Sequence, residues 1–210
     1  MSSGQAGKGL FALGGTGTII LTVASVIMAF IGLMAVNGLM VFNRVWDPWI
    51  IIDSFAWYLI LVIGLVLLLI GSIFIGIAYY AFYRHFERPM SIAGLIFGIV
   101  CSVSLLVFAA VGMFPVRFGI YPDYLSPFSW VLYWLGMLLF GTMLIIWGIT
   151  SIVVRKSTNT PGLSLATGII LIVAGCLVAS FLLTFVGFTL LLTSQIMNTI
   201  VFLKMAFSSN

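Results

Sequence analysis

The charged residues of this chain that could bind a ligand lie in two short polar segments between long apolar runs. They are Arg44, Asp47 and Asp53 in residues 43–54, and Arg117 and Asp123 in residues 115–127. Each arginine could bind an anionic headgroup or substrate, or could cap helix carbonyls and reach the membrane interface, which is the commoner role of such positions. The carboxylates could pair with the arginines and order each loop. We take these five residues as candidates for binding or anchoring.

Residues suited to catalysis or metal binding are scarce. His85 is the single histidine, and its neighbours Arg84, Glu87 and Arg88 indicate a solvated turn. One histidine excludes, within this chain, a haem held by paired histidines and a metal held by several imidazoles. We expect no cofactor and no metal, and we favour a protein that is not an enzyme. Catalysis by the two polar segments, 43–54 and 115–127, is the alternative.

An uncharged polar group stands out near the C-terminus. Ser194, Gln195 and Asn198 share one face of a helix, since the two amides are three residues apart. We expect this face to contact a polar group of another helix, in this chain or in a partner.

A seam of small residues at four-residue spacing is formed by Gly94, Gly98 and Ser102. Such a seam is typical of close helix packing, within a chain or between copies.

The composition places these residues in a membrane protein. Of the 210 residues, 63% are hydrophobic and 6% are charged, with a mean hydropathy of +1.34. About 20 apolar residues make one spanning helix, so the length allows five or six spans and no soluble domain. We predict an all-α, polytopic membrane protein with five clear transmembrane helices and a short sixth hydrophobic element at the C-terminus.

Charges and prolines divide the chain into a single transmembrane domain, residues 18–204, between a cytoplasmic tail, 1–17, and a C-terminal tail, 205–210. The glycines of the first tail favour a flexible or interfacial segment. The uncharged run from Leu163 to Leu203 is too long for one span, and we expect a break near Gly187. The predicted spans are 18–42, 55–83, 91–114, 128–154 and 163–186, with a possible sixth at 188–204.

An internal repeat relates two parts of the chain. Arg44, Phe55 and Trp57 recur as Arg117, Phe128 and Trp130, all at an offset of 73 residues. Units of two spans keep the same orientation, so we predict tandem parallel two-helix repeats that superpose by rotation about an axis close to the membrane normal.

The basic residues indicate an orientation. The tail, the segment 84–89 and the segment 155–161 hold five Lys and Arg on one side, against one in each opposite loop. The positive-inside rule places the N-terminus in the cytoplasm.

The basic residues form no continuous stripe of the kind that binds nucleic acid, so we expect membrane lipid and not nucleic acid as a partner.

Three functions remain after these exclusions. We favour a non-catalytic accessory subunit that packs against other membrane subunits or against copies of itself, because the seam and the polar face suit helix contacts. The alternatives are a channel or carrier for a neutral or lipidic solute, and an outer-face binder of lipid headgroups. The five clear spans hold no Asp, Glu, Lys, Arg or His, which disfavours ion-coupled transport.

The orientation yields a first prediction. Lys8, His85 and Arg155 should face the cytoplasm, while Trp46 and Tyr121 face outward. Single-cysteine labelling in intact cells checks it, and a Ser157→Cys chain should resist an impermeant reagent. Labelling of that cysteine from outside the cell would overturn the orientation.

Overall fold

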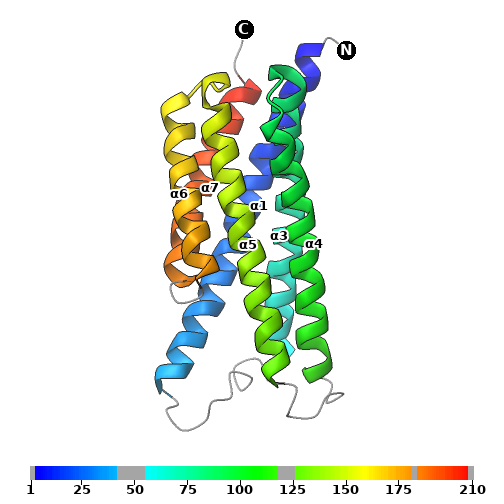
Figure 1. The fold of residues 1–210 in the computed structure, drawn as a ribbon, viewed down its shortest axis with the longest axis vertical. Coiled ribbons are helices and arrows are strands. Elements are labelled where there is room, and N and C mark those ends of the chain that lie inside the picture. Colours follow the sequence, from blue (N-terminus) through cyan, green and yellow to red (C-terminus); the bar gives the residue numbers. More distant parts are fainter. Residues whose placement is uncertain (1–2, 42–54, 118–125, 181–183, 208–210) are drawn as a thin grey trace.

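A computed structural model describes residues 3–41, 55–117, 126–180 and 184–207. These residues form six α-helices, one short 3-10 helix and no strand (Figure 1). The prediction of an all-α membrane protein is confirmed, because five of the helices contain stretches long and apolar enough to cross a bilayer. The elements are α1 (Ser3–Val41), α3 (Phe55–Phe86), α4 (Met90–Arg117), α5 (Ser126–Val154), η2 (Arg155–Ser157), α6 (Pro161–Ala179) and α7 (Thr184–Phe207).

Proline, capping and helix boundaries follow from the local sequence. Pro161 opens α6 at its first turn, where its missing N–H leaves no helical bond unmade. At the other end of α6, the Ser180 N–H donates to the Cys176 carbonyl at 3.0 Å.

The candidate spans are Gly7–Ile27, Val62–Phe86, Leu135–Ser157, Pro161–Ala179 and Val186–Phe207, and α4 contributes a shorter apolar stretch, Met90–Ser104.

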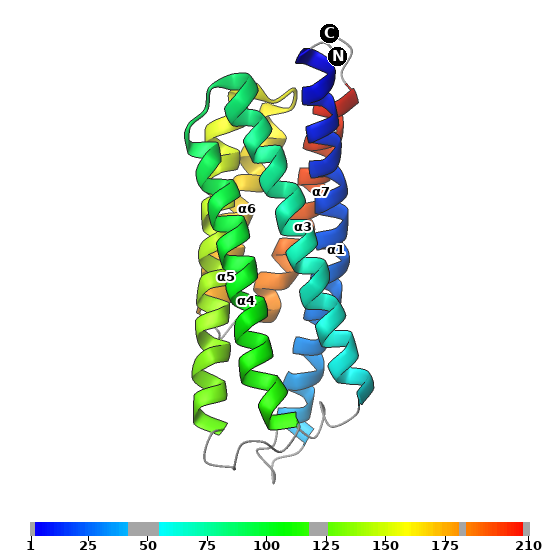
Figure 2. The same ribbon diagram turned by 90° about the vertical axis from the view of Figure 1, so that its right-hand side faces the viewer.

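The six helices pack as a closed ring. Each contacts the next in the order α1, α3, α4, α5, α6 and α7, and α7 returns to contact α1. Successive helices run in opposite directions, so both termini lie at the same end of the bundle (Figure 1). Figure 2 shows α1 and α3 on one side of the bundle and α4 and α5 on the other. The inward faces of the six helices therefore enclose one interior.

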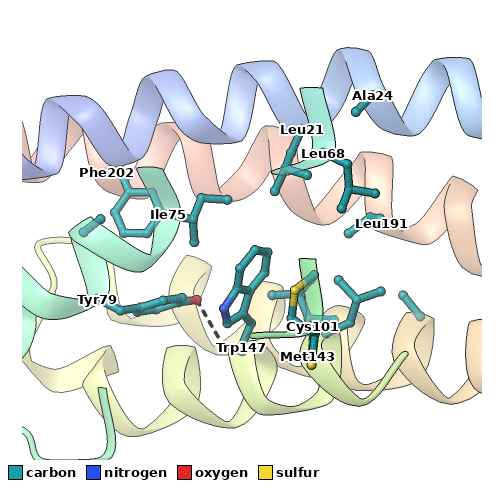
Figure 3. Packing of buried hydrophobic residues seen from close by; sticks show 14 of the residues in the cluster. Leu21, Ala24, Leu68, Ile75, Tyr79, Cys101, Met143, Trp147, Leu191 and Phe202 are labelled. Atoms are coloured by element: carbon teal, nitrogen blue, oxygen red, sulfur yellow. Dashed lines mark hydrogen bonds between the residues drawn. The ribbon is translucent and has the colours of Figure 1, made fainter. Parts of the chain in front are cut away.

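Large side chains fill much of this interior (Figure 3). Trp147 is fully buried, and its Nε1–H donates to the Gly94 carbonyl at 2.8 Å. The Tyr79 hydroxyl lies 2.9 Å from Ser151 Oγ, which joins α3 to α5. Toward the end with the termini, the Phe82 ring lies between the rings of Phe11, at 4.9 Å, and Phe202, at 6.4 Å. Buried polar groups at these aromatic contacts thus have partners.

Glycine pairs bring neighbouring backbones unusually close. A Cβ placed on Gly148 would lie 2.6 Å from the Gly168 carbonyl oxygen, and one on Gly168 would lie 2.7 Å from the Gly148 oxygen. Gly141 and Gly175 have the same reciprocal relation at 2.5 Å. This second pair lies about two helical turns from the first, toward the start of α5 and the end of α6. Such contacts occur only where neither residue has a side chain, and they allow weak Cα–H···O bonds between helices.

The predicted N-terminal tail, residues 1–17, is helical from Ser3 onward, because α1 already begins there. Its glycines serve packing. A Cβ on Gly14 would collide with Ala78, and one on Gly15 would lie 2.8 Å from Leu203 Cδ2. These contacts with α3 and α7 outweigh the poor helix propensity of glycine, which is about 1 kcal/mol below that of alanine.

The break in the last apolar run also differs from the prediction. Helix α6 ends at Ala179 and α7 begins at Thr184, so the division precedes Gly187. Gly187 lies inside α7 and is buried, and a Cβ there would lie 3.0 Å from the Ala174 carbonyl oxygen. The glycine marks a close approach to α6 and not a break. Consequently the sixth element is a helix of 24 residues, longer than the short segment predicted.

The internal repeat stays a prediction. Helices α3 and α5 begin at the same end of the bundle, so the backbones of Trp57 and Trp130 lie at that end, as a parallel repeat requires (Figure 1). Any ring of helices that alternate in direction would place the starts of α3 and α5 at the same end. The arrangement therefore does not establish that α3 and α4 are related to α5 and α6 by descent or by superposition.

The glycine contacts generate a second prediction. Gly148→Ala should lower the free energy of unfolding by about 1–3 kcal/mol, because the added methyl group overpacks the α5–α6 contact and meets the backbone. Gly9→Ala is the matched control, since nothing lies within 4 Å of a Cβ at that position of α1. The control should be neutral or stabilising by up to about 1 kcal/mol.

Thermal or denaturant unfolding of both variants in mild detergent measures the difference. Equal stability of the two variants would show that α5 and α6 do not approach as closely as their backbones indicate.

Candidate functional site

The polar face predicted near the C-terminus lies on the inward side of α7. Leu191, Gln195, Asn198 and Phe202 are spaced by four, three and four residues, so they form one stripe along the helix. Figure 3 shows Leu191 and Phe202 pointing into the interior that also holds Trp147. The two amide side chains, between Leu191 and Phe202 along this stripe, therefore belong to the interior of the ring.

Both amide side chains are buried, and three of their four polar atoms have no hydrogen-bond partner among the described residues. Gln195 is fully buried, and Asn198 is 3% exposed. Among the described residues, Gln195 Nε2, Gln195 Oε1 and Asn198 Nδ2 have no hydrogen-bond partner. The hydrogen bonds that the sequence led us to expect from these amides to another helix are thus absent from the described part of the chain. Their burial also means that they present no face to a second protein.

Hydroxyl groups beside the amides behave differently, because each bonds to a backbone carbonyl of its own helix. Ser194 Oγ donates to the Leu191 carbonyl at 2.8 Å, and Thr199 Oγ1 donates to the Gln195 carbonyl at 2.8 Å. Thr199 Oγ1 also lies 2.8 Å from Thr18 Oγ1 of α1. A short hydroxyl side chain reaches its own backbone, whereas Gln195 Nε2 and Asn198 Nδ2 make no such bond.

The surroundings of the amides carry no formal charge. Between the helix ends, the sequence of the six helices contains no Asp, Glu, Lys, Arg or His. Within the described ranges, no group of three His, Cys, Asp or Glu residues could hold a metal ion. What the amides offer chemically is hydrogen bonding, with two N–H donors and one carbonyl acceptor on each side chain.

The remaining candidate residues fall in two classes. Gly94 and Gly98 of α4 face neighbouring helices, where added Cβ atoms would lie 2.9 Å from Tyr79 Cδ2 and 3.1 Å from Trp147 Cζ2. Ser102 Oγ lies 3.7 Å from Met143 Sδ. This seam packs inside the chain. The outer-loop candidates Arg44, Asp47, Asp53 and Asp123 lie outside the described residues, and Arg117 is the last residue of α4, with a side chain that is also outside the description.

Sequence reasoning missed the contact between Thr18 and Thr199. Thr18 stands at the start of a predicted span and Thr199 near the end of the chain, 181 residues away. A threonine in an apolar run usually bonds to its own backbone, so neither residue carries a signal of the contact. Only the closure of the ring by α1 and α7 brings the two together.

Comparisons with known proteins give no name for this arrangement. No protein family model, no curated protein and no solved structure matches the chain. The function has to be argued from the interior itself.

The unpartnered amides generate a third prediction. Gln195→Met, which keeps the shape of the side chain, should raise the stability of the purified protein by about 1–3 kcal/mol, because it removes a buried polar group that lacks a hydrogen bond. Thr199→Val is the control, and it should lower stability by about 0.6 kcal/mol because it removes a bond between helices.

Unfolding in detergent measures both variants. A loss of stability in Gln195→Met would show that the amide has a partner in the folded protein.

Proposed function

We propose that this multi-pass membrane protein is a channel or carrier for a small neutral polar solute, which binds between the helices at Gln195 and Asn198. The observation that carries the proposal is the pair of buried amides whose donors and acceptor have no partner among the described residues. A protein of this class needs polar groups inside its bundle, and here they lie on the inward stripe of α7.

The energetic argument concerns why an amide occupies this position. Burying an amide without a hydrogen bond costs about 1–3 kcal/mol in proteins, and more in a fully apolar medium. Leucine or methionine at position 195 would avoid this penalty. A side chain that opposes folding in this way is typical of a functional site, where stability is given up for binding.

The chemistry of the amides limits the solute. A neutral amide stabilises neither a cation nor an anion by charge, and away from the ends of the described helices the sequence offers no Asp, Glu, Lys, Arg or His to do so. A molecule that both donates and accepts hydrogen bonds, and carries no charge, fits these groups. Water, urea and small polyols belong to this class.

The accessory-subunit hypothesis receives less support from the same observations. It rested on the amides and the small-residue seam as surfaces for a partner. Both lie inside the chain and not on its surface, since Gln195 is fully buried and Gly98 lies against Trp147. The outward faces that remain are apolar, with exposed residues such as Ile96, Val100 and Ile196 that suit lipid as well as they suit protein.

The orientation with the N-terminus in the cytoplasm belongs to this proposal as well. Lys8, Arg155 and Lys204 stand on helix ends that share one side of the bundle (Figure 1). The positive-inside rule favours the cytoplasm for that side.

Flux measurements test the proposal as a fourth prediction. Proteoliposomes containing the full chain should take up at least one of water, urea and glycerol faster than protein-free liposomes, as measured by stopped-flow light scattering. Replacing both amides, as Gln195→Leu with Asn198→Leu, should reduce this excess by about tenfold, since two hydrogen bonds are worth about 1–3 kcal/mol and 1.4 kcal/mol is a factor of ten.

Thr193→Leu provides the control, because Thr193 is exposed on the outward face of the same helix and its loss should leave the flux unchanged. A wild-type flux equal to that of protein-free liposomes for all three probes would count against a channel or carrier of this class. An unchanged flux in the double variant would exclude the amides as its site.

A further inference from the structure

Basic side chains gather at the end of the bundle that holds both termini. Lys8 lies near the start of α1, Arg84 lies in the last turn of α3, and Lys204 lies in the last turn of α7. Arg88 stands between α3 and α4, and Arg155 and Lys156 form η2. Glu87 is the one acidic residue described at this end.

Direct contacts join the segments that carry these charges. Arg88 Nε donates to Ser157 Oγ at 3.4 Å, which connects the α3–α4 turn to η2. Asn159 Nδ2 donates to the Lys204 carbonyl at 3.4 Å, which connects the start of α6 to the end of α7. A Cβ on Gly7 would lie 2.8 Å from His85 Nε2, so the start of α1 adjoins the end of α3. The six basic residues therefore belong to one continuous surface.

The six cations outnumber the one described carboxylate at this end, that of Glu87. Within the described ranges, none of the six basic side chains forms an ion pair with a carboxylate. Lys8, Arg84, Lys156 and Lys204 are exposed, and Arg88 and Arg155 are half-buried. Unpaired cations on a surface attract anions, and the strength of the attraction depends on ionic strength.

Aromatic residues place this surface at the membrane interface. Tyr80, Tyr83 and Phe86 lie on the last turns of α3 beside Arg84, and all three are exposed. Exposed tyrosines at the end of a spanning helix are typical of the headgroup region of a bilayer. The cations next to them are then level with lipid phosphate groups.

We propose that this basic end binds the phosphate groups of anionic phospholipids. Guanidinium groups such as those of Arg84 and Arg155 match phosphate oxygens in geometry and charge, and the lysines add attraction without a fixed geometry. A zwitterionic lipid carries its own cation beside the phosphate, so it gains less from this surface. Anionic lipid is therefore held at the basic end in preference to zwitterionic lipid.

Thermal unfolding of the full chain in detergent tests the proposal, with phosphatidylglycerol, phosphatidylcholine and inorganic phosphate as separate additions. Phosphatidylglycerol should raise the melting temperature by about 3 °C more than phosphatidylcholine, because a ligand that binds only the folded state stabilises it. The excess should disappear in 1 M salt, where the Debye length is about 3 Å. Inorganic phosphate at the same phosphate concentration should give no such rise.

Two matched variants locate the effect. Arg155→Gln with Lys156→Gln should lose most of the excess rise, whereas Arg44→Gln with Arg117→Gln should keep it. The second pair removes the same charge from Arg117, the last residue of α4, and from Arg44, which follows α1 in the sequence. Equal rises with both lipids, an equal rise with inorganic phosphate, or loss of the rise only in the second variant would each overturn the proposal. The flux through the bundle is a separate measurement, and its failure leaves this binding unaffected.

Discussion

The close approach of helix backbones at paired glycines is the constraint on which the rest of this structure depends. Inside a bilayer the hydrophobic effect does not drive one apolar helix onto another, so association relies on packing and on hydrogen bonds. The reciprocal contacts of Gly148 with Gly168 and of Gly17 with Gly71 supply such packing on opposite parts of the ring. Because the backbones meet at these points, six helices can close on a common interior.

That interior explains the distribution of polar groups. Trp147 and Tyr79 are large enough to reach polar groups of other helices, at Gly94 and Ser151, and they satisfy their own polar atoms. Many of the described threonine and serine hydroxyls bond to backbone carbonyls of their own helices, and that of Ser164 donates to the Ser151 carbonyl of α5. Gln195 and Asn198 do neither, although they stand on the same inward stripe as Leu191 and Phe202. Apart from Thr160 Oγ1 just before α6, the buried side-chain polar atoms without a partner among the described residues belong to these two amides. This contrast supports a binding role for them.

The sequence predicts the class of the fold and the residues of the polar face. It does not predict which helix faces point into the bundle and which point to lipid. Long apolar runs show that helices cross the membrane, and the spacing of Gln195 and Asn198 shows that they share a side. Which side faces lipid is not readable, because the helices are apolar all round and give no amphipathic signal. The glycines mislead for a related reason. Around Gly14 and Gly187 they indicate a tail and a break, whereas in the fold they are sites of close contact with neighbouring helices.

The central claim is that the interior amides are reserved for a bound polar molecule. An experimental density map of the protein in a lipid nanodisc, at a resolution that shows ordered water, tests it most directly. The account predicts density separate from the protein within hydrogen-bonding distance of the Gln195 and Asn198 amides. Amides bonded instead to a carbonyl or side chain of a neighbouring helix, with no separate density beside them, would contradict it.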